Sequence, residues 1–154
     1  MNKEYAIVTD GSCDLPKELC QEKGITVVPF YVSFDGEKYE KEIVEMPIRQ
    51  FYEDMVKNPK VFPKSSMPSV QDYMDAFMPI VQEGKAIICI CITTKFSGSM
   101  QSALNARMMI LEQHPDAEIT VIDATINTVL QGIYVLEAQK MNCLLYTSDA
   151  ADEG

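Results

Sequence analysis

The amino-acid sequence predicts a three-layer α/β/α domain with a largely parallel sheet. Short β-branched runs alternate along the chain with stretches of helical periodicity, which is the order expected when helices connect parallel strands. The run AIICICIT at 86–93 is apolar throughout and too short for a lone helix, so it is typical of a strand covered on both faces. With 154 residues, 47% of them hydrophobic, the chain can bury one core of ordinary size.

The chain is expected to begin with a strand, a polar turn and a helix. The strand is YAIVTD at 5–10, which is rich in β-branched residues, and the turn residues GSCD follow it. Residues 15–24 then form a helix, because Pro16 stands at the start of this segment and Gly24 at its end.

The next part of the chain combines a hairpin signal with a helix. Two β-rich stretches are interrupted by Pro29, and Asp35-Gly36 indicates a hairpin at the end of the second stretch. Residues 46–59 carry apolar side chains at spacings of three, four and seven, which predicts an amphipathic helix. Residues 60–68 are expected to form a loop.

The second half of the chain alternates helices and strands. Ser69 is a candidate N-cap, with Asp72 three residues further on, for a helix that ends at Gly84. The remaining expected elements are strands at 86–93 and 118–124, a helix that stops before Pro115 and a helix at 129–141. The apolar face of the helix before Pro115 is predicted to contain Met100, Ala103, Leu104, Met108 and Leu111.

The composition excludes some partners. The net charge of -10 argues against nucleic acid, because binding to a phosphate backbone needs clustered Lys and Arg. No window reaches the apolar length of a membrane span, and the short apolar run near the N-terminus does not fit a signal peptide, so a cytoplasmic protein is expected. The five cysteines are odd in number and lie mostly in apolar patterns, which suits reduced thiols.

Cys89 and Cys91 lie two residues apart in an expected strand and would share one face of it. Their separation, about 6.5 to 7 Å along a strand, is long for a disulfide. No cluster of His or Cys completes a metal shell, so we interpret both residues as core thiols. The methionines of the predicted helices, Met74, Met78, Met100, Met108 and Met109, are expected to face the core rather than an apolar ligand.

Polar loops follow three of the expected strands, where a parallel sheet collects its ligands. The most distinctive is Ser97-Gly98-Ser99 at a helix start, which offers backbone N–H groups without helical partners, hydroxyl donors and a positive dipole end. Such a turn can hold a carboxylate or a phosphate. The alternative is that Ser97 or Ser99 only caps the helix.

Other chemistries have less support in the sequence. There is no Walker pattern or GxGxxG fingerprint for a nucleotide. Serine hydrolysis needs a histidine base, and the single histidine, His114, stands at a helix end. Asp10 and Asp14 could hold a metal, but carboxylates at this spacing more often cap the turn and the helix after it.

Four segments in order resemble the N-terminal half of the DegV family of fatty-acid-binding proteins. They are IVTDGSCDLP, KSSMPS, TTKFSGSMQSALNA and VIDATINTVLQGIYVLEA, and together they span residues 5 to about 140. The resemblance implies a DegV-like N-terminal α/β domain at 1–142, from which the second domain of the family is missing. It also implies a bacterial carrier without catalytic residues, without a metal and without a cofactor besides its ligand.

The ligand implied by the resemblance is a long-chain fatty acid, which a fatty acid kinase converts to an acyl phosphate. The Thr-Ser-x-Pro motif of the family falls on Ser65 to Pro68, and its Ser-Gly motif falls on Ser97-Gly98. The resemblance therefore assigns the carboxylate to Ser65 and Ser97, with the amide of Gly98 or Ser99 assisting. Several donors lower the cost of burying a carboxylate.

Some positions depart from the pattern of the family. The Asp-Ser of its first motif appears as Asp10-Gly11-Ser12, which leaves a hydroxyl role to Ser12, and Ala124 replaces a usual serine. Residues 143–154, CLLYTSDAADEG, lose helical periodicity and resemble read-through of a sequencing adapter, so we expect a non-native tail.

Two other functions stay open from the sequence. A small hydrolase or phosphotransfer domain could use Ser97 or Ser12 as its nucleophile, and the chain could be a gene fragment without a function. If the second domain is missing, an exposed apolar face is expected to cause self-association.

Overall fold

The computed structural model describes residues 3–152 and contains the predicted parallel sheet. Its strands are β1 (Tyr5–Asp10), β2 (Thr26–Val28), β6 (Ala86–Cys91) and β7 (Ile119–Asp123). They lie in the order β2-β1-β6-β7, and every neighbouring pair is parallel. The expected fold class, α/β with a largely parallel sheet, is therefore confirmed.

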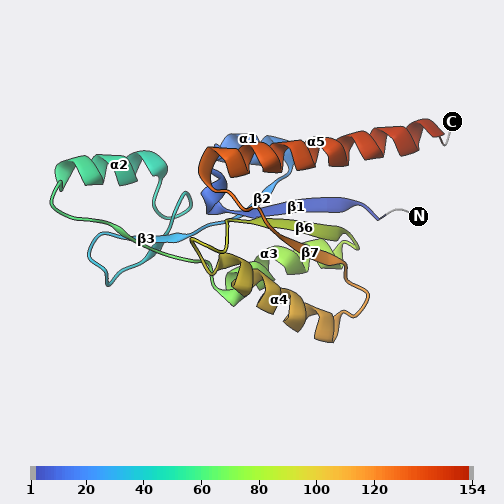
Figure 1. Cartoon of the computed structure of the whole chain (residues 1–154), viewed down its shortest axis with the longest axis horizontal. Coiled ribbons are helices and arrows are strands. Elements are labelled where there is room, and N and C mark those ends of the chain that lie inside the picture. Colours follow the sequence, from blue (N-terminus) through green and yellow to red (C-terminus); the bar gives the residue numbers. More distant parts are fainter. Residues whose placement is uncertain (1–2, 153–154) are drawn as a thin grey trace.

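Helices cover both faces of this sheet (Figure 1). On one face lie α1 (Lys17–Lys23) and α5 (Thr128–Asp152), and on the other lie α3 (Val70–Gln82) and α4 (Ser99–Gln113). Each interface has its own core. Tyr73 and Phe77 of α3 pack with strand residues such as Cys89 on one side, and Val135 of α5 packs with Ile7 on the other. The three-layer arrangement is thus as predicted.

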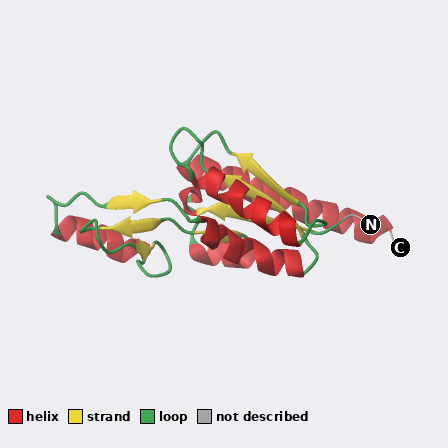
Figure 2. Cartoon of the chain, turned by 90° about the horizontal axis from the view of Figure 1, so that it is seen from below, coloured by secondary structure: helices red, strands yellow, loops and turns green. Residues whose placement is uncertain are grey.

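A second, antiparallel sheet lies beyond the carboxyl ends of the parallel strands (Figures 1 and 2). It has the order β4-β3-β5, from β4 (Glu40–Lys41), β3 (Tyr31–Ser33) and β5 (Lys64–Ser66), and α2 (Ile48–Lys57) lies beside it. The hairpin predicted at Asp35-Gly36 joins β3 to β4. We refer to this unit as the small sheet.

The expected loop at 60–68 was wrong in part, because it contains β5. Ser65 pairs with Val32 of β3, and Ser66 pairs with Tyr31. Lys-Ser-Ser has little intrinsic preference for a strand, so the pairing with β3, distant in sequence, creates β5. The strand then places Ser65 opposite a buried residue of the small sheet.

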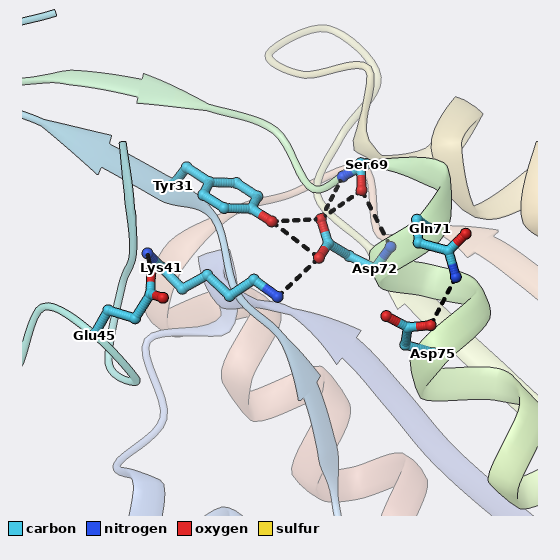
Figure 3. Close-up of polar contacts among 7 residues, drawn as sticks. All are labelled: Tyr31, Lys41, Glu45, Ser69, Gln71, Asp72 and Asp75. Carbon is cyan, nitrogen blue, oxygen red and sulfur yellow. Dashed lines mark hydrogen bonds and ion pairs between the residues drawn. The ribbon is translucent and has the colours of Figure 1, made fainter. Parts of the chain in front are cut away.

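The predicted start of α3 is confirmed and also joins the two sheets (Figure 3). Ser69 and Asp72 form a capping box, in which the Ser69 hydroxyl accepts from the Asp72 N–H and the Asp72 carboxylate accepts from the Ser69 N–H at 2.9 Å. The same carboxylate accepts from the Tyr31 hydroxyl and the Lys41 ammonium, each at 3.0 Å. Asp72 therefore fixes the small sheet to the start of α3.

The buried face of α4 differs from the predicted one. Ala103 is buried as expected, but Met108 and Met109 are 59% and 43% exposed, so their expected place in the core was wrong. The residues of α4 that are buried are mostly small: Ser99, Ser102, Ala103, Ala106 and Ile110. Small side chains let the helix approach its neighbours closely, and this outweighs the greater hydrophobicity of methionine. Met74, Met78 and Met100 do pack against the core.

The last helix is longer than predicted. The helix expected at 129–141 begins at Thr128 and continues to Asp152, so the backbone of 143–152 is helical where we expected the helical pattern to be lost. The interpretation of 143–154 as a non-native tail stays a prediction. Among the residues described, none of the helices has the length and apolar character that crossing a membrane requires.

Candidate functional site

Two of the segments singled out in the sequence meet at the carboxyl edge of the parallel sheet. A methyl group placed on Gly98 would lie 2.8 Å from the Sδ atom of Met67. The segment that runs from Ser65 to Pro68 therefore lies against the Ser97-Gly98 turn, although about 30 residues separate them in the sequence. The fold thus brings together the two predicted serine motifs.

The Ser97-Gly98 turn keeps donors available for a ligand. The Ser97 hydroxyl accepts from the Ser99 N–H at 3.1 Å, and its own proton can still be donated outward. Gly98 is the N-cap residue of α4 and is exposed, and within residues 3–144 its N–H group has no acceptor. Ser97 is half-buried. The N-cap position is therefore occupied by Gly98 and by neither of the two serines, while the Ser97 hydroxyl binds the first N–H of the helix.

Ser99 occupies a different position from its neighbours. Its side chain is fully buried, and its hydroxyl donates to the Asp10 carboxylate at 2.9 Å and lies 2.6 Å from the Tyr73 hydroxyl. These partners lie inside the domain. The Ser99 hydroxyl is therefore used within the protein, whereas the half-buried Ser97 hydroxyl has no partner besides the Ser99 N–H in the described part of the chain.

Asp10 is the centre of this buried network. One carboxylate oxygen, Oδ2, accepts from the Ile92 N–H at 2.9 Å as well as from Ser99, and the other accepts from the Gln131 amide at 2.9 Å. Burial raises the pKa of Asp10, while the hydrogen bonds from Gln131, Ile92 and Ser99 oppose that rise. Oδ1 also accepts from the Ser12 N–H, as expected for an Asp that caps a turn.

Two further members of this network, Gln131 and Tyr73, were not predicted from the sequence. Both side chains are fully buried, and Gln131 donates to Thr9 at 3.1 Å as well as to Asp10. The only local signal was a polar glutamine on the apolar side of a helix. Its Oε1 atom is the one buried side-chain N or O atom in the described part of the chain that has no hydrogen-bond partner.

Ser65 and Ser12 belong to different parts of the fold, since Ser65 lies on the small sheet and Ser12 lies beside the start of α5. Ser65 is exposed on β5 and shares a face of the small sheet with Val32, because directly paired residues of antiparallel strands point the same way. Ser12 is half-buried, and its hydroxyl accepts from the Thr128 N–H at 3.5 Å at the start of α5. Ser12 therefore contacts α5, whereas Ser65 belongs to the segment that contacts the Ser97-Gly98 turn.

A largely apolar cavity of about 140 Å³ lies between the small sheet, α2 and the turn after β1. Its lining includes Val32, Ile48 and Phe51, together with two acidic residues, Asp14 and Glu42. Glu42 accepts from the Phe30 N–H at 3.0 Å, and burial raises its pKa. A cavity of this size holds roughly one benzene-sized group, so it can enclose only part of a long acyl chain.

The Glu42 side chain lies directly against Gly11. A methyl group on Gly11 would collide with the Glu42 carboxylate, so a side chain at this position would displace Glu42 from its present place. A serine at position 11, as in the pattern of the family, would therefore require the Glu42 carboxylate to move.

Several other groups considered from the sequence lie apart from this edge. Cys89 and Cys91 are fully buried with their sulfur atoms 3.7 Å apart, as predicted for core thiols. His114 follows the last residue of α4, so it lies about 20 Å from the Ser97-Gly98 turn at the other end of that helix. Within the described residues, no group of three or more His, Cys, Asp or Glu side chains could hold a metal ion.

The fold and the site define an α/β domain with hydroxyl and amide donors at the carboxyl edge of its sheet. Residues 4–142 match the family model described as "Uncharacterised protein, DegV family". The chain therefore belongs to the DegV family, as its sequence motifs predicted.

Curated and solved relatives extend this comparison. A DegV domain-containing protein of Clostridium perfringens is 32% identical over 134 residues, which are 87% of this chain and 46% of that protein. The solved structure of a stearic acid-binding protein from Eubacterium ventriosum has a TM-score of 0.86 and 46% identity, covering 89% of this chain and 47% of that one. The DegV fatty acid-binding protein of Bacillus subtilis has a TM-score of 0.78 and 27% identity, with coverage of 91% and 48%. The chain thus spans about half the length of the relatives it matches.

Proposed function

We propose that this domain is part of a non-enzymatic carrier that holds a long-chain fatty acid by its carboxylate. Ser65 and Ser97 donate their hydroxyls to the carboxylate, and the Gly98 N–H assists. The observation that carries the proposal is the contact between Met67 and Gly98, which puts the two serine segments side by side. Fatty acid binding by the relatives from E. ventriosum and B. subtilis supports the choice of ligand.

The energetics of the site favour an anion with an apolar tail. The start of α4 presents an unpartnered N–H group and the positive end of a helix of 15 residues, which together favour a negative charge. The cavity between the small sheet and α2 gives an acyl chain a surface on which to bury methylene groups, each contributing about 0.8 kcal/mol. Because Asp14 and Glu42 line that cavity, the carboxylate belongs at the serines and the acyl chain in the cavity.

The remaining sequence-predicted site residues have different parts in this proposal. The amide of Ser99 is already bound to Ser97, and its hydroxyl is bound to Asp10 and Tyr73, so Ser99 contributes as a support of the turn. Ser12 lies beside Thr128 and assists the ligand from the α5 side. Neither residue acts as a nucleophile in the proposed carrier.

The role of the carrier follows from its ligand. We infer that a fatty acid kinase receives the bound fatty acid and phosphorylates its carboxylate, and that the carrier works in the cytoplasm, where buried thiols such as Cys89 and Cys91 stay reduced. We also infer self-association through the exposed apolar stripe of α5. The stripe contains Val129, Leu130, Ile133 and Tyr134, each at least 46% exposed.

A hydrolase or phosphotransfer function is the alternative, and the geometry gives it less support. The single histidine lies at the far end of α4 from Ser97. Asp10, the buried carboxylate nearest in the hydrogen-bond network, is bound to Ser99 rather than to Ser97. Turnover of an ester or phosphate substrate that Ser97→Ala abolishes would establish this alternative.

The proposal is tested by measuring stearic acid binding to the purified chain and its variants. Ser65→Ala with Ser97→Ala should weaken binding about 30-fold or more, because two hydrogen bonds to a charged group are lost. Ser66→Ala is the matched control, since Ser66 is also exposed but lies on the opposite face of β5. Its affinity should stay within about twofold of the wild type.

Two further observations sharpen this experiment. Native mass spectrometry followed by lipid extraction shows whether the chain carries fatty acid when purified. Acyl phosphate formation by an added fatty acid kinase should be supported by the wild type and by Ser66→Ala, and not by the double variant. A folded wild-type chain that binds no fatty acid, or a double variant that binds as tightly as the wild type, would contradict the proposal.

A further inference from the structure

We propose that Asp10 and Ser99 are positioning residues for the carboxylate site, because they fix both ends of the loop that carries Ser97 and Gly98. This inference rests on the proposed function, and it adds residues that do not touch the ligand. It also gives a role to the buried polar network that fatty acid binding alone leaves unexplained.

The Asp10 carboxylate holds both ends of the loop at 93–98. A single atom, Asp10 Oδ2, accepts from the Ile92 N–H at 2.9 Å and from the Ser99 hydroxyl at 2.9 Å. Ile92 directly follows β6, and Ser99 is the first residue of α4, so one oxygen joins the two ends of the intervening loop at 93–98. The loop therefore cannot change its span without breaking one of these two hydrogen bonds.

The connection from Asp10 to the proposed donors is short. Ser99 is bound to Asp10 through its hydroxyl and to Ser97 through its N–H group, at 2.9 and 3.1 Å. The Ser97 hydroxyl is thus connected to the Asp10 carboxylate through two successive hydrogen bonds. A shift of Ser99 would move Ser97, and it would turn the first free N–H groups of α4 away from the ligand.

Asp10 is itself held in place on its other side. Its Oδ1 atom accepts from the Gln131 amide at 2.9 Å and from the Ser12 N–H at 3.3 Å. Four donors directed at one fully buried side chain leave it little freedom to rotate. The loop is therefore fixed to the last residue of β1, a central strand of the sheet, and α5 binds the same residue through Gln131.

Tyr73 provides a way to separate positioning from general stability. Its hydroxyl lies 2.6 Å from the Ser99 hydroxyl, in the same buried network, and Tyr73 belongs to α3. Tyr73→Phe removes one buried hydroxyl but leaves the contacts of Asp10 with Ser99 and Ile92. Ser99→Ala removes one buried hydroxyl and breaks the contact with Asp10. Both variants should be less stable than the wild type, whereas only Ser99→Ala should change the geometry of the loop at 93–98.

The test compares the affinity for cis-parinaric acid, a fluorescent C18 fatty acid, with urea unfolding for each variant. Ser99→Ala should bind about tenfold more weakly, and Tyr73→Phe should stay within about twofold of the wild type. Ser99→Thr, which retains the hydroxyl, should restore most of the affinity. If Ser99→Ala does not fold, Ser99→Cys replaces it, because it keeps the volume with a much weaker donor.

A measurement without ligand keeps the inference separate from the proposed function. In NMR spectra of the ligand-free chain, the amide signals of Ser97 and Gly98 should shift or broaden in Ser99→Ala and stay in place in Tyr73→Phe. Unchanged signals in both variants, or equal losses of affinity in both, would overturn the inference. A wild type that binds no fatty acid would contradict the proposed function, and the amide signals would then decide the inference alone.

Discussion

Replacing Asp72 by Asn should loosen the small sheet from the rest of the domain. The Asp72 carboxylate accepts from the Tyr31 hydroxyl and the Lys41 ammonium at 3.0 Å, and from the Ser69 hydroxyl at 2.7 Å (Figure 3). Its side chain is only 8% exposed. The amide of Asn keeps the shape of the side chain but removes the charge and one acceptor.

The expected loss can be worked from these contacts. Hydrogen bonds to a charged group contribute about 1.5–3 kcal/mol, and the Lys41 side chain is 35% exposed, so solvent screens its ion pair. We expect Asp72→Asn to lower the free energy of unfolding by about 2 kcal/mol, which corresponds to a fall in Tm of roughly 4–8 °C. The Ser69 hydroxyl still caps α3 in this variant.

The same contact should depend on pH in a defined direction. Burial alone would raise the pKa of Asp72, but hydrogen bonds from Ser69, Lys41 and Tyr31 outweigh it and lower the pKa from 3.8 to about 2. The folded chain thus binds this proton more weakly than the unfolded chain. The stabilisation is present above pH 3.8 and is lost as the pH falls towards 2. After allowance for screening, the loss is about 1–2 kcal/mol.

The assay is urea unfolding followed by circular dichroism at several pH values between 7 and 2. Asp75→Asn is the control, since Asp75 lies on the same helix, is exposed and accepts from Gln71 at 2.7 Å. The wild type and Asp75→Asn should converge with Asp72→Asn as the pH falls towards 2. Curves that stay parallel at every pH, or equal stabilities for Asp72→Asn and Asp75→Asn at pH 7, would refute the reasoning.

Two further substitutions test the packing of α5 within the domain and the role of its exposed apolar stripe. Gly132→Ala should destabilise the domain by about 2–3 kcal/mol in urea unfolding, because its methyl group would collide with the backbone carbonyl of Cys13; a loss no larger than that of Ala138→Gly would contradict this. If the apolar stripe of α5 drives self-association, sedimentation equilibrium should show dimers, and Ile133→Glu should shift the chain to monomers. A wild type that stays monomeric at high concentration would refute the role of the stripe.

The sequence predicted the elements whose signals are local. The apolar run that contains β6 needed only its composition and length to identify a strand covered on both faces. The start of α3 needed only a serine and an acid three residues apart. In each case the physical cause of the element lies within one turn or one strand, so no knowledge of distant contacts was required.

The elements that the sequence analysis missed depend on distant partners. The strand β5 exists because Lys64–Ser66 pair with β3, and nothing in Lys-Ser-Ser indicates this partner. The buried face of α4 follows its small residues, whereas hydrophobicity alone pointed to Met108. Helix phase depends on which side chains fit against a neighbouring layer, and that choice is made in three dimensions.

In the candidate site, too, some features can be predicted from the local sequence and others depend on distant contacts. Ser97 and Ser99 look equivalent in the sequence, since both flank Gly98 at a helix start. The structure separates them, because Ser99 begins the helix and turns inward to Asp10, whereas Ser97 precedes it. A difference of two positions around a helix start thus decides which hydroxyl is buried against Asp10 and which stays half-buried.

The two segments that carry the proposed donors are each fixed by a poorly exposed aspartate. Asp72 fixes the start of α3, directly after the segment with Ser65, and Asp10 fixes both ends of the loop with Ser97. Donors that compete with water for a carboxylate gain affinity when their geometry is set before the ligand arrives. Under the proposed function, the affinity for the carboxylate is therefore expected to depend on these two aspartates as well as on the serines. Loop hydroxyls can be recognised in a sequence, whereas the acids that orient them are defined only by the fold.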